Sequence, residues 1–255
     1  MVAAMYGQVA EHPRHGYRMV AAELRREGWR VNAKRVYRLW RREGLKVARK
    51  AREHRAKGGS ANSCVNRPAT HKDDVWAMDF IHDSTASGGS LKMLVIEDEF
   101  TRECLALEVG GGRFGGERVA EVLTELFTIR GVPSGLRSDN GKEFTGTAVA
   151  GRLKAAGVEP LAVEAGCPWE NGVVESLNSI LRDEMLNTEM FRTARAARDM
   201  ATAWRLEYNH RRPHGALGYL APAEYAARCQ PAPGSAALRP TRPGSGTHSK
   251  TMVLS

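Results

Sequence analysis

A succession of apolar segments begins near Asp74. Three apolar runs follow one another at residues 75–81, 91–96 and 104–109, and a short polar stretch separates each from the next. Runs of this length, bounded by turn residues, are typical of buried strands. Because the connections between them are short, the three runs predict an antiparallel meander.

The apolar spacing then changes to that of a helix. Residues 117–130 are predicted to form an amphipathic helix, with apolar side chains at Val119, Val122, Leu123, Leu126 and Phe127. Shorter elements alternate after it and lead into two long helices: strand 136–138, helix 147–156, strand 159–163, helix 171–187 and helix 195–209. This order predicts an α/β fold with a mixed five-stranded sheet and helices flanking both faces.

Two shorter helices are predicted ahead of the sheet, at residues 18–27 and 33–43. Gly28 ends the first helix, and Asn32 is a good N-cap for the second. Two short helices around a tight link, the second rich in Arg, resemble a small helix-turn-helix-like domain. Residues 1–12 are too short and mixed to assign to an element.

Composition shifts divide the chain into five expected segments. Residues 46–72 combine a basic stretch with Gly, Ser and Asn, which is typical of a flexible linker. The last stretch is rich in Pro, Gly, Ser and Ala, which predicts a disordered tail. The segments are a helix-turn-helix-like basic region (1–45), a basic linker (46–72), an α/β core (73–187), a C-terminal helix with a basic return segment (188–229) and the tail (230–255).

Positive charge is concentrated at the N-terminus. The whole chain of 255 residues has a formal net charge of +9. Residues 1–70 hold 17 Lys and Arg against 5 Asp and Glu, whereas the other 185 residues hold 21 against 24. Such asymmetry indicates a polyanionic partner, with nucleic acid the leading case, although a solvated basic face is the alternative from charge alone.

Other classes of protein are disfavoured by the sequence. It has no apolar run of about 18 residues, which a membrane span needs, and no secretory signal at its start. The four cysteines lie far apart without a C-x-x-C pair, which favours reduced thiols over a disulfide frame or a zinc site. We therefore expect a cytoplasmic protein.

Three acids suggest a metal site. Asp79 ends an apolar run, Asp139 follows a short predicted strand, and Glu175 lies early in a predicted helix, with thirty-five residues between the last two. Taken singly, Asp139 would be a turn residue and Glu175 a surface glutamate. Together, three carboxylates on separate elements suit Mg²⁺ or Mn²⁺, which prefer oxygen ligands.

Four motifs carry a family resemblance. They are W-A-M-D-F, S-D-N-G-K-E-F, G-C-P-W-E-N-G-V-V-E-S-L-N and Y-N-H-R-R-P-H-G-A-L-G-Y-L-A-P. These motifs, over about residues 12–225, resemble the integrase-core (DDE) transposases of bacterial insertion sequences, which are related to retroviral integrases. The chain looks like the product of the second reading frame (OrfB-type). The resemblance implies a ribonuclease-H-like fold and an integrase-type core at residues 73–187.

The resemblance also implies an activity. Asp79, Asp139 and Glu175 would be the catalytic acids that hold two Mg²⁺ or Mn²⁺ ions for DNA cleavage and strand transfer. The family places a basic residue seven positions after the glutamate, which is Arg182 here. Lys142 stands where relatives usually have Pro and could add a phosphate contact. Further DNA contacts are expected at Arg35, Arg38, Arg41, Arg42, Arg211 and Arg212.

The implied partners are DNA, at the element ends and the target, and a first-frame transposase product or a fusion with it. We expect a multimer on DNA, bound at the bacterial nucleoid, and no membrane partner. Two alternatives stay open at this point. One is a catalytically idle DNA-binding regulator, and the other is a structure-specific nuclease that stops at hydrolysis.

Overall fold

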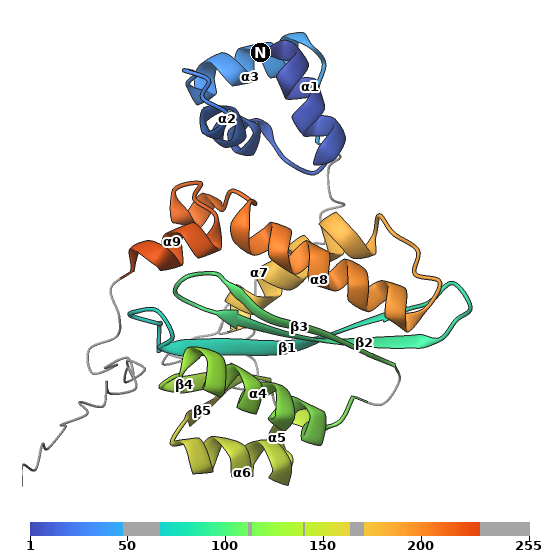
Figure 1. The fold of residues 1–255 in the computed structure, drawn as a ribbon, viewed down its shortest axis with the longest axis vertical. Coiled ribbons are helices and arrows are strands. Elements are labelled where there is room, and N and C mark those ends of the chain that lie inside the picture. Colours follow the sequence, from blue (N-terminus) through green and yellow to red (C-terminus); the bar gives the residue numbers. More distant parts are fainter. Residues whose placement is uncertain (48–66, 112–113, 140, 164–170, 230–255) are drawn as a thin grey trace, which may run out of the picture.

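A five-stranded mixed sheet forms the centre of the protein (Figure 1). The structure, a computed structural model, describes residues 1–47, 67–111, 114–139, 141–163 and 171–229. The strand order is β3-β2-β1-β4-β5. The strands are β1 (Val75–Ser84), β2 (Ser90–Asp98), β3 (Cys104–Gly111), β4 (Gly135–Ser138) and β5 (Glu159–Ala162).

Strand directions follow the lengths of the connections. β1, β2 and β3 are joined by short turns and pair antiparallel, which confirms the predicted meander. β4 and β5 pair parallel, β4 with β1 and β5 with β4, because a helix intervenes before each of them. The predicted fold class, a mixed five-stranded sheet with flanking helices, is confirmed.

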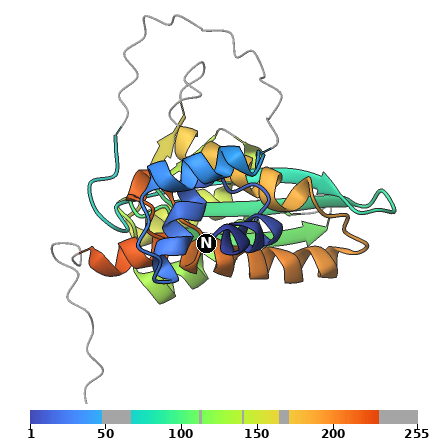
Figure 2. The same ribbon diagram turned by 90° about the horizontal axis from the view of Figure 1, so that it is seen from above.

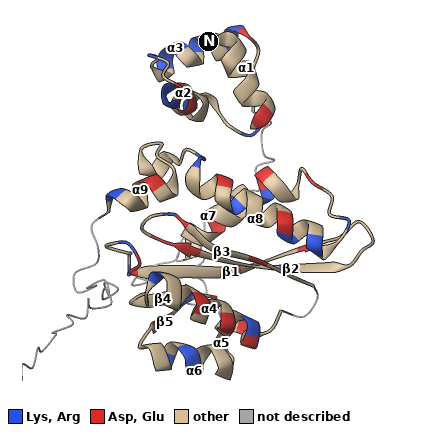
Figure 3. Cartoon of the chain, viewed as in Figure 1, with Lys and Arg blue, Asp and Glu red and all other residues tan. Residues whose placement is uncertain are grey.

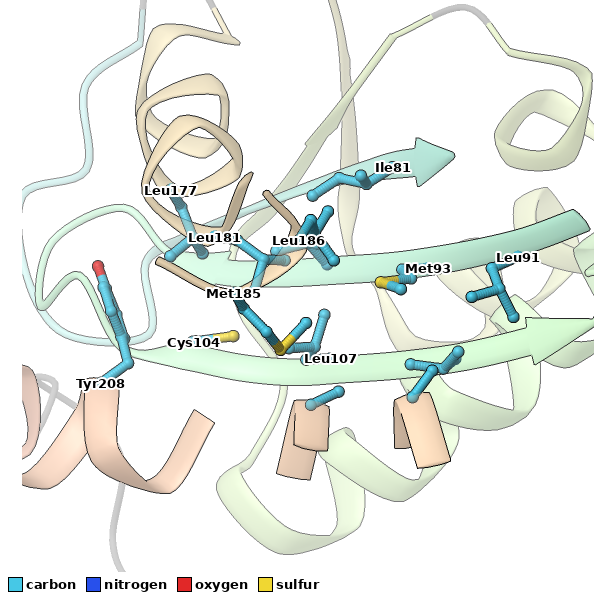
Figure 4. Packing of buried hydrophobic residues seen from close by; sticks show 14 of the residues in the cluster. Ile81, Leu91, Met93, Cys104, Leu107, Leu177, Leu181, Met185, Leu186 and Tyr208 are labelled. Carbon is cyan, nitrogen blue, oxygen red and sulfur yellow. The ribbon is translucent and has the colours of Figure 1, made fainter. Parts of the chain in front are cut away.

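Helices cover both faces of the sheet (Figure 1). One face carries α4 (Gly116–Arg130), α5 (Lys142–Thr145) and α6 (Thr147–Ala156); the other carries α7 (Gly172–Leu181) and α8 (Ala194–His210). Side chains alternate along β1, so Trp76 and Met78 pack under α4 and α6, whereas Ala77 and Ile81 pack under α7 and α8. Figure 4 shows the α7–α8 side of this core.

The predicted helix 171–187 is not one regular helix. α7 ends at Leu181, and a π-helical turn, η2 (Arg182–Leu186), continues it. The backbone N–H of Asn187 accordingly donates to the carbonyl oxygen of Arg182, five residues back, at 2.8 Å. Met185 and Leu186 are buried in the core beside Leu181, so the wider turn keeps apolar side chains facing the sheet.

An N-terminal helical unit lies over the α7–α8 layer (Figures 1 and 2). It consists of α1 (Val2–Glu11), α2 (Tyr17–Arg26) and α3 (Ala33–Arg42) around Met5, Leu24, Val36 and neighbouring apolar residues. Asn32 caps α3 as predicted, because its side chain accepts a hydrogen bond from the Arg35 N–H at 2.8 Å. α1 was not assigned from the sequence, because its burial depends on packing against α2.

The C-terminal part adds short elements that the sequence did not predict: the 3₁₀ turn η3 (Gly215–Leu217) and α9 (Pro222–Arg228). Most of the expected linker, residues 48–66, and the expected tail, residues 230–255, lie outside the described residues. Within the described ranges, no helix is long and apolar enough to cross a membrane.

Candidate active site

Asp79 is a polar residue in the middle of the central strand. Strand alternation places its side chain on the same face as Ala77 and Ile81, under α7. Its Oδ1 accepts a hydrogen bond from the backbone N–H of Phe80 at 2.8 Å. Its Oδ2 accepts one from Nδ2 of Asn178 at 2.6 Å. A carboxylate inside this apolar strand is therefore held in one orientation from two sides.

Asp139 lies just beyond the end of β4. In the parallel pair, Ala77 of β1 stands opposite Arg137 of β4. Continuing that register by two residues on each strand leads to Asp79 and Asp139, so the two side chains leave the sheet on the same face at neighbouring positions. The N–H of Gly141 donates to Oδ1 of Asp139 at 3.0 Å. A Cβ at Gly141 would lie 2.9 Å from that oxygen, so glycine permits this close turn.

Glu175 reaches the same region from α7, which packs across β1 and β2. It stands in the first turn of α7, and Asn178 follows one turn later. Residues three apart share a helix face. Because Asn178 contacts Asp79, Glu175 faces the same side of the sheet.

The three acids influence one another electrostatically. Burial raises the pKa of Asp79 above its ordinary value, and the hydrogen bond from Phe80 opposes that rise. The negative charges of Asp139 and Glu175 raise the pKa of Asp79 further. The structure thus brings together three acids that are far apart in sequence.

The donor set suits a hard divalent cation. It consists of carboxylate oxygens, the ligands that Mg²⁺ and Mn²⁺ prefer, and a cation there would offset the repulsion acting on Asp79. Among the residues the structure describes, no group of three or more His, Cys, Asp or Glu side chains is arranged to hold a metal ion as it stands. Residue 140, directly after Asp139, and residues 164–170, before α7, lie outside the described residues. The three acids therefore suit a divalent cation by the chemistry of their oxygen atoms and by their common face of the sheet.

Asn178 received no role from the sequence. It is buried, and its Oδ1 has no hydrogen-bond partner among the described residues. The sequence could have predicted a role for this residue, because a position three residues after a candidate catalytic glutamate lies on the same helix face. An amide at that position can hold a neighbouring carboxylate without adding charge.

The opposite face of β1 anchors the turn that carries Asp139. Glu143 of α5 forms an ion pair with the buried Lys92 of β2, and this pairing lowers the pKa of Glu143. Nζ of Lys92 lies 4.0 Å from the ring centroid of Phe80. Phe80 also stacks on Phe144 at 4.9 Å between centroids. These contacts bind residues 142–145 to the sheet next to Asp139.

The arginines predicted for DNA binding on α3 lie on its solvent face. α3 buries Val36 and Trp40 against the other helices of its unit. Four side chains on its outer surface are exposed: Arg35, Arg38, Arg41 and Arg42. Figure 3 marks the positions of Lys and Arg residues on α2 and α3 in blue.

The remaining candidate DNA contacts differ in exposure. Lys142 and Arg182 are exposed beside Asp139 and at the end of α7. The Arg211 side chain is 69% exposed. The Arg212 side chain is only 12% exposed and donates two-pronged hydrogen bonds of 2.7–2.9 Å to Glu184. Arg212 therefore holds the C-terminal segment to the turn η2.

Two family descriptions match this chain. The integrase core domain matches residues 69–168 and 156–222, and an HTH-like domain matches residues 2–53. An uncharacterized 31.7 kDa protein of insertion element IS407 from Burkholderia multivorans is 39% identical over 226 residues, which are 86% of this chain and 77% of that protein. The transposase InsD for insertion element IS2 from Escherichia coli is 29% identical over 85% of this chain and 75% of its own length.

A solved structure shares the fold. A chain of the simian T-cell lymphotropic virus intasome, solved in complex with PP2A regulatory subunit B56 gamma, matches with a TM-score of 0.50 and 16% identity. The match covers 72% of this chain and 63% of that chain, so less than two thirds of the viral chain is spanned. At this level of identity the likeness concerns the fold alone.

Proposed function

Since this chain belongs to the integrase-core transposases of bacterial insertion elements, we propose that it catalyses metal-dependent DNA cleavage and strand transfer at the ends of such an element. The observation that carries the proposal is the convergence of Asp79, Asp139 and Glu175 on one face of the sheet. Asn178 gives further support, because it fixes the Asp79 carboxylate from the helix that bears Glu175.

In this proposal each residue has a distinct task. Asp79, Asp139 and Glu175 would hold two Mg²⁺ or Mn²⁺ ions, which would activate the attacking oxygen and stabilise the leaving oxygen at phosphorus. Asn178 orients Asp79, and the N–H of Gly141 orients Asp139. Cleavage by water and attack by a 3′ hydroxyl are both in-line displacements at phosphorus, so the same acids serve both steps.

DNA delivery falls to other parts of the chain. The exposed arginines of α3 would contact the phosphates of the element end, and Lys142, Arg182 and Arg211 would contact the strand near the acids. We propose a multimer on DNA in which a first-frame product, separate or fused, supplies additional end binding. That division of labour agrees with the distribution of charge, because residues 1–70 carry a net positive charge, whereas the other 185 residues hold 21 Lys and Arg against 24 Asp and Glu.

The test is Asp139→Asn in the full chain, assayed with a duplex that carries an element end and with Mg²⁺ or Mn²⁺. We expect cleavage and strand transfer to fall by at least about 10³-fold, because one amide replaces a metal-binding carboxylate, while DNA affinity stays within about twofold. A matched control is Glu121→Gln, which removes an exposed carboxylate on α4.

Each outcome of that assay is informative. Strand transfer at the normal rate in Asp139→Asn would refute the assignment of the site. Binding by the native chain without any cleaved product would favour a DNA-binding regulator, and nicked products without joined products would favour a nuclease.

A further inference from the structure

The N-terminal helical unit contacts the core through a small set of charged groups. Arg14, in the link between α1 and α2, forms an ion pair with Asp183 of η2. Arg26 of α2 forms an ion pair with Glu224 of α9. It also donates to the backbone carbonyl of Arg211. The unit is thus bound to the core by side chains as well as by the chain that joins them.

The link between α1 and α2 contains one buried residue, His15, beside Arg14. His15 is 5% exposed, and its ring stacks on that of His12 at 4.5 Å between centroids. Burial lowers the pKa of His15 to about 3, so the ring stays neutral at neutral pH. The Arg14 and Asp183 side chains are each 19% exposed. A side chain so enclosed presents little surface to DNA, and its guanidinium is directed at the core.

The turn η2 is held from two sides. Asp183 pairs with Arg14 of the N-terminal unit, whereas its neighbour Glu184 accepts the hydrogen bonds of Arg212 from the C-terminal segment. Two adjacent carboxylates therefore join three parts of the chain at one point. Short π-helical turns frequently occur at functional sites.

That turn directly continues the helix of the proposed active site. α7 carries Glu175 and Asn178, and η2 begins at the residue after its end, Leu181. A shift or rotation at η2 would move α7 as a rigid rod and so displace Glu175 and the amide that orients Asp79. Small displacements of catalytic groups reduce rate strongly.

The basic face of α3 is left open by this arrangement. Arg35, Arg38, Arg41 and Arg42 remain exposed while α2 and the α1–α2 link contact the core. Figures 1 and 3 show α3 on the side of the unit away from the sheet. The docked position is therefore compatible with DNA on α3.

We propose that Arg14 is a positioning residue: through its ion pair with Asp183 it fixes the turn η2 and thereby the setting of Glu175. The N-terminal unit then contributes to the chemical step as well as to DNA binding. This inference rests on the proposed function, but the state of η2 can be measured without any catalysis.

The experiment compares Arg14→Ala, the charge-reversed pair Arg14→Asp with Asp183→Arg, and the native full chain. Two readouts are needed: amide hydrogen exchange over residues 172–187, and the rate of Mg²⁺-dependent cleavage of bound DNA. For Arg14→Ala we expect exchange in this segment to increase and the rate to fall about tenfold, with DNA affinity within about twofold. The reversed pair should restore both readouts. Arg30→Ala, which removes an exposed charge from the same unit, is the control.

Three results would overturn the proposal. One is unchanged exchange over residues 172–187 in Arg14→Ala. Another is a loss of DNA affinity that accounts for the whole loss of rate, because Arg14 would then be a DNA contact. The third is failure of the reversed pair to restore exchange. If the native chain cleaved no DNA, the proposed function would fail, and the exchange readout would still decide whether Arg14 holds the turn.

Discussion

At the scale of single residues, the site depends on how one carboxylate is tolerated inside a buried strand. Asp79 lies among apolar neighbours, and burial raises its pKa. The hydrogen bonds from Phe80 and Asn178 favour the ionised form and limit that rise. A carboxylate must be ionised to bind a metal ion, so in the proposed function these two donors would support metal binding as well as folding.

Asn178→Ala tests this balance. Loss of the amide removes a bond to the ionised carboxylate, so the pKa of Asp79 rises further. The acid limb of the pH–rate profile for metal-dependent cleavage should therefore move to higher pH, and the rate at pH 7 should fall about tenfold. Ser176→Ala, at an exposed position of the same helix, should leave the profile unchanged. An unshifted profile in Asn178→Ala would contradict the role given to Asp79.

At the scale of elements, polar side chains of α8 bind the edge of the sheet formed by β3. β3 is an edge strand, whose backbone groups would otherwise lack partners. Arg198 and Arg205 donate to the carbonyl oxygens of Val109 and Leu105 at 2.9 and 3.0 Å. Asn209 both accepts from the N–H and donates to the carbonyl of Cys104, each at 2.9 Å. These polar side chains of α8 thus provide hydrogen-bond partners for backbone groups of the edge strand β3.

Asn209→Ala should destabilise the fold. It leaves the buried N–H and carbonyl of Cys104 without partners, which we expect to cost about 3 kcal/mol. Urea denaturation measures the loss, and hydrogen exchange of the Cys104 amide locates it. Thr202→Ala, on the exposed side of α8, should change the stability by less than about 0.5 kcal/mol. Equal stability of the two variants would show that the two hydrogen bonds between Asn209 and Cys104 contribute little to the stability of the fold.

At the scale of the whole molecule, positive charge and candidate catalytic groups are separated. The net positive charge lies in the N-terminal part, where Lys and Arg residues lie on α2 and α3 (Figure 3). Four exposed arginines of that part lie on α3. The candidate acids lie on the α7 side of the sheet. DNA bound by α3 would therefore have to extend to the core, in the same chain or in another copy.

The salt dependence of DNA binding measures the share carried by α3. Replacing Arg38 and Arg41 by Ala should reduce the slope of log K against log salt by about 2, because each phosphate contact contributes about 0.9. The matched control removes two exposed charges from α6, with Arg152→Ala and Lys154→Ala. A similar change of slope in both double variants would show that α3 has no special part in binding.

Local patterns were sufficient for the class of fold and for the family. Nearly continuous burial along β1 and β2 corresponds to apolar runs in the sequence that predict strands, and the short connections predict their antiparallel pairing. The motifs around Asp79, Asp139 and Glu175 pointed to the integrase-core family, which the comparisons confirmed. Such features depend on residues close together in sequence, so they can be predicted without a structure.

Other features exist only through contacts between distant segments. α1 is recognisable by its packing on α2, and η2 by the way Met185 and Leu186 are drawn into the core. The sequence predicted the same role, a DNA contact, for Arg211 and Arg212. In the structure Arg212 pairs with Glu184, whereas the Arg211 side chain is largely exposed to solvent. The partnership of Asn178 with Asp79 spans 99 positions. The sequence by itself thus determined the strands, the main helices and the acids that are available. The tertiary structure decided which polar groups meet, because their partners come from segments far along the chain.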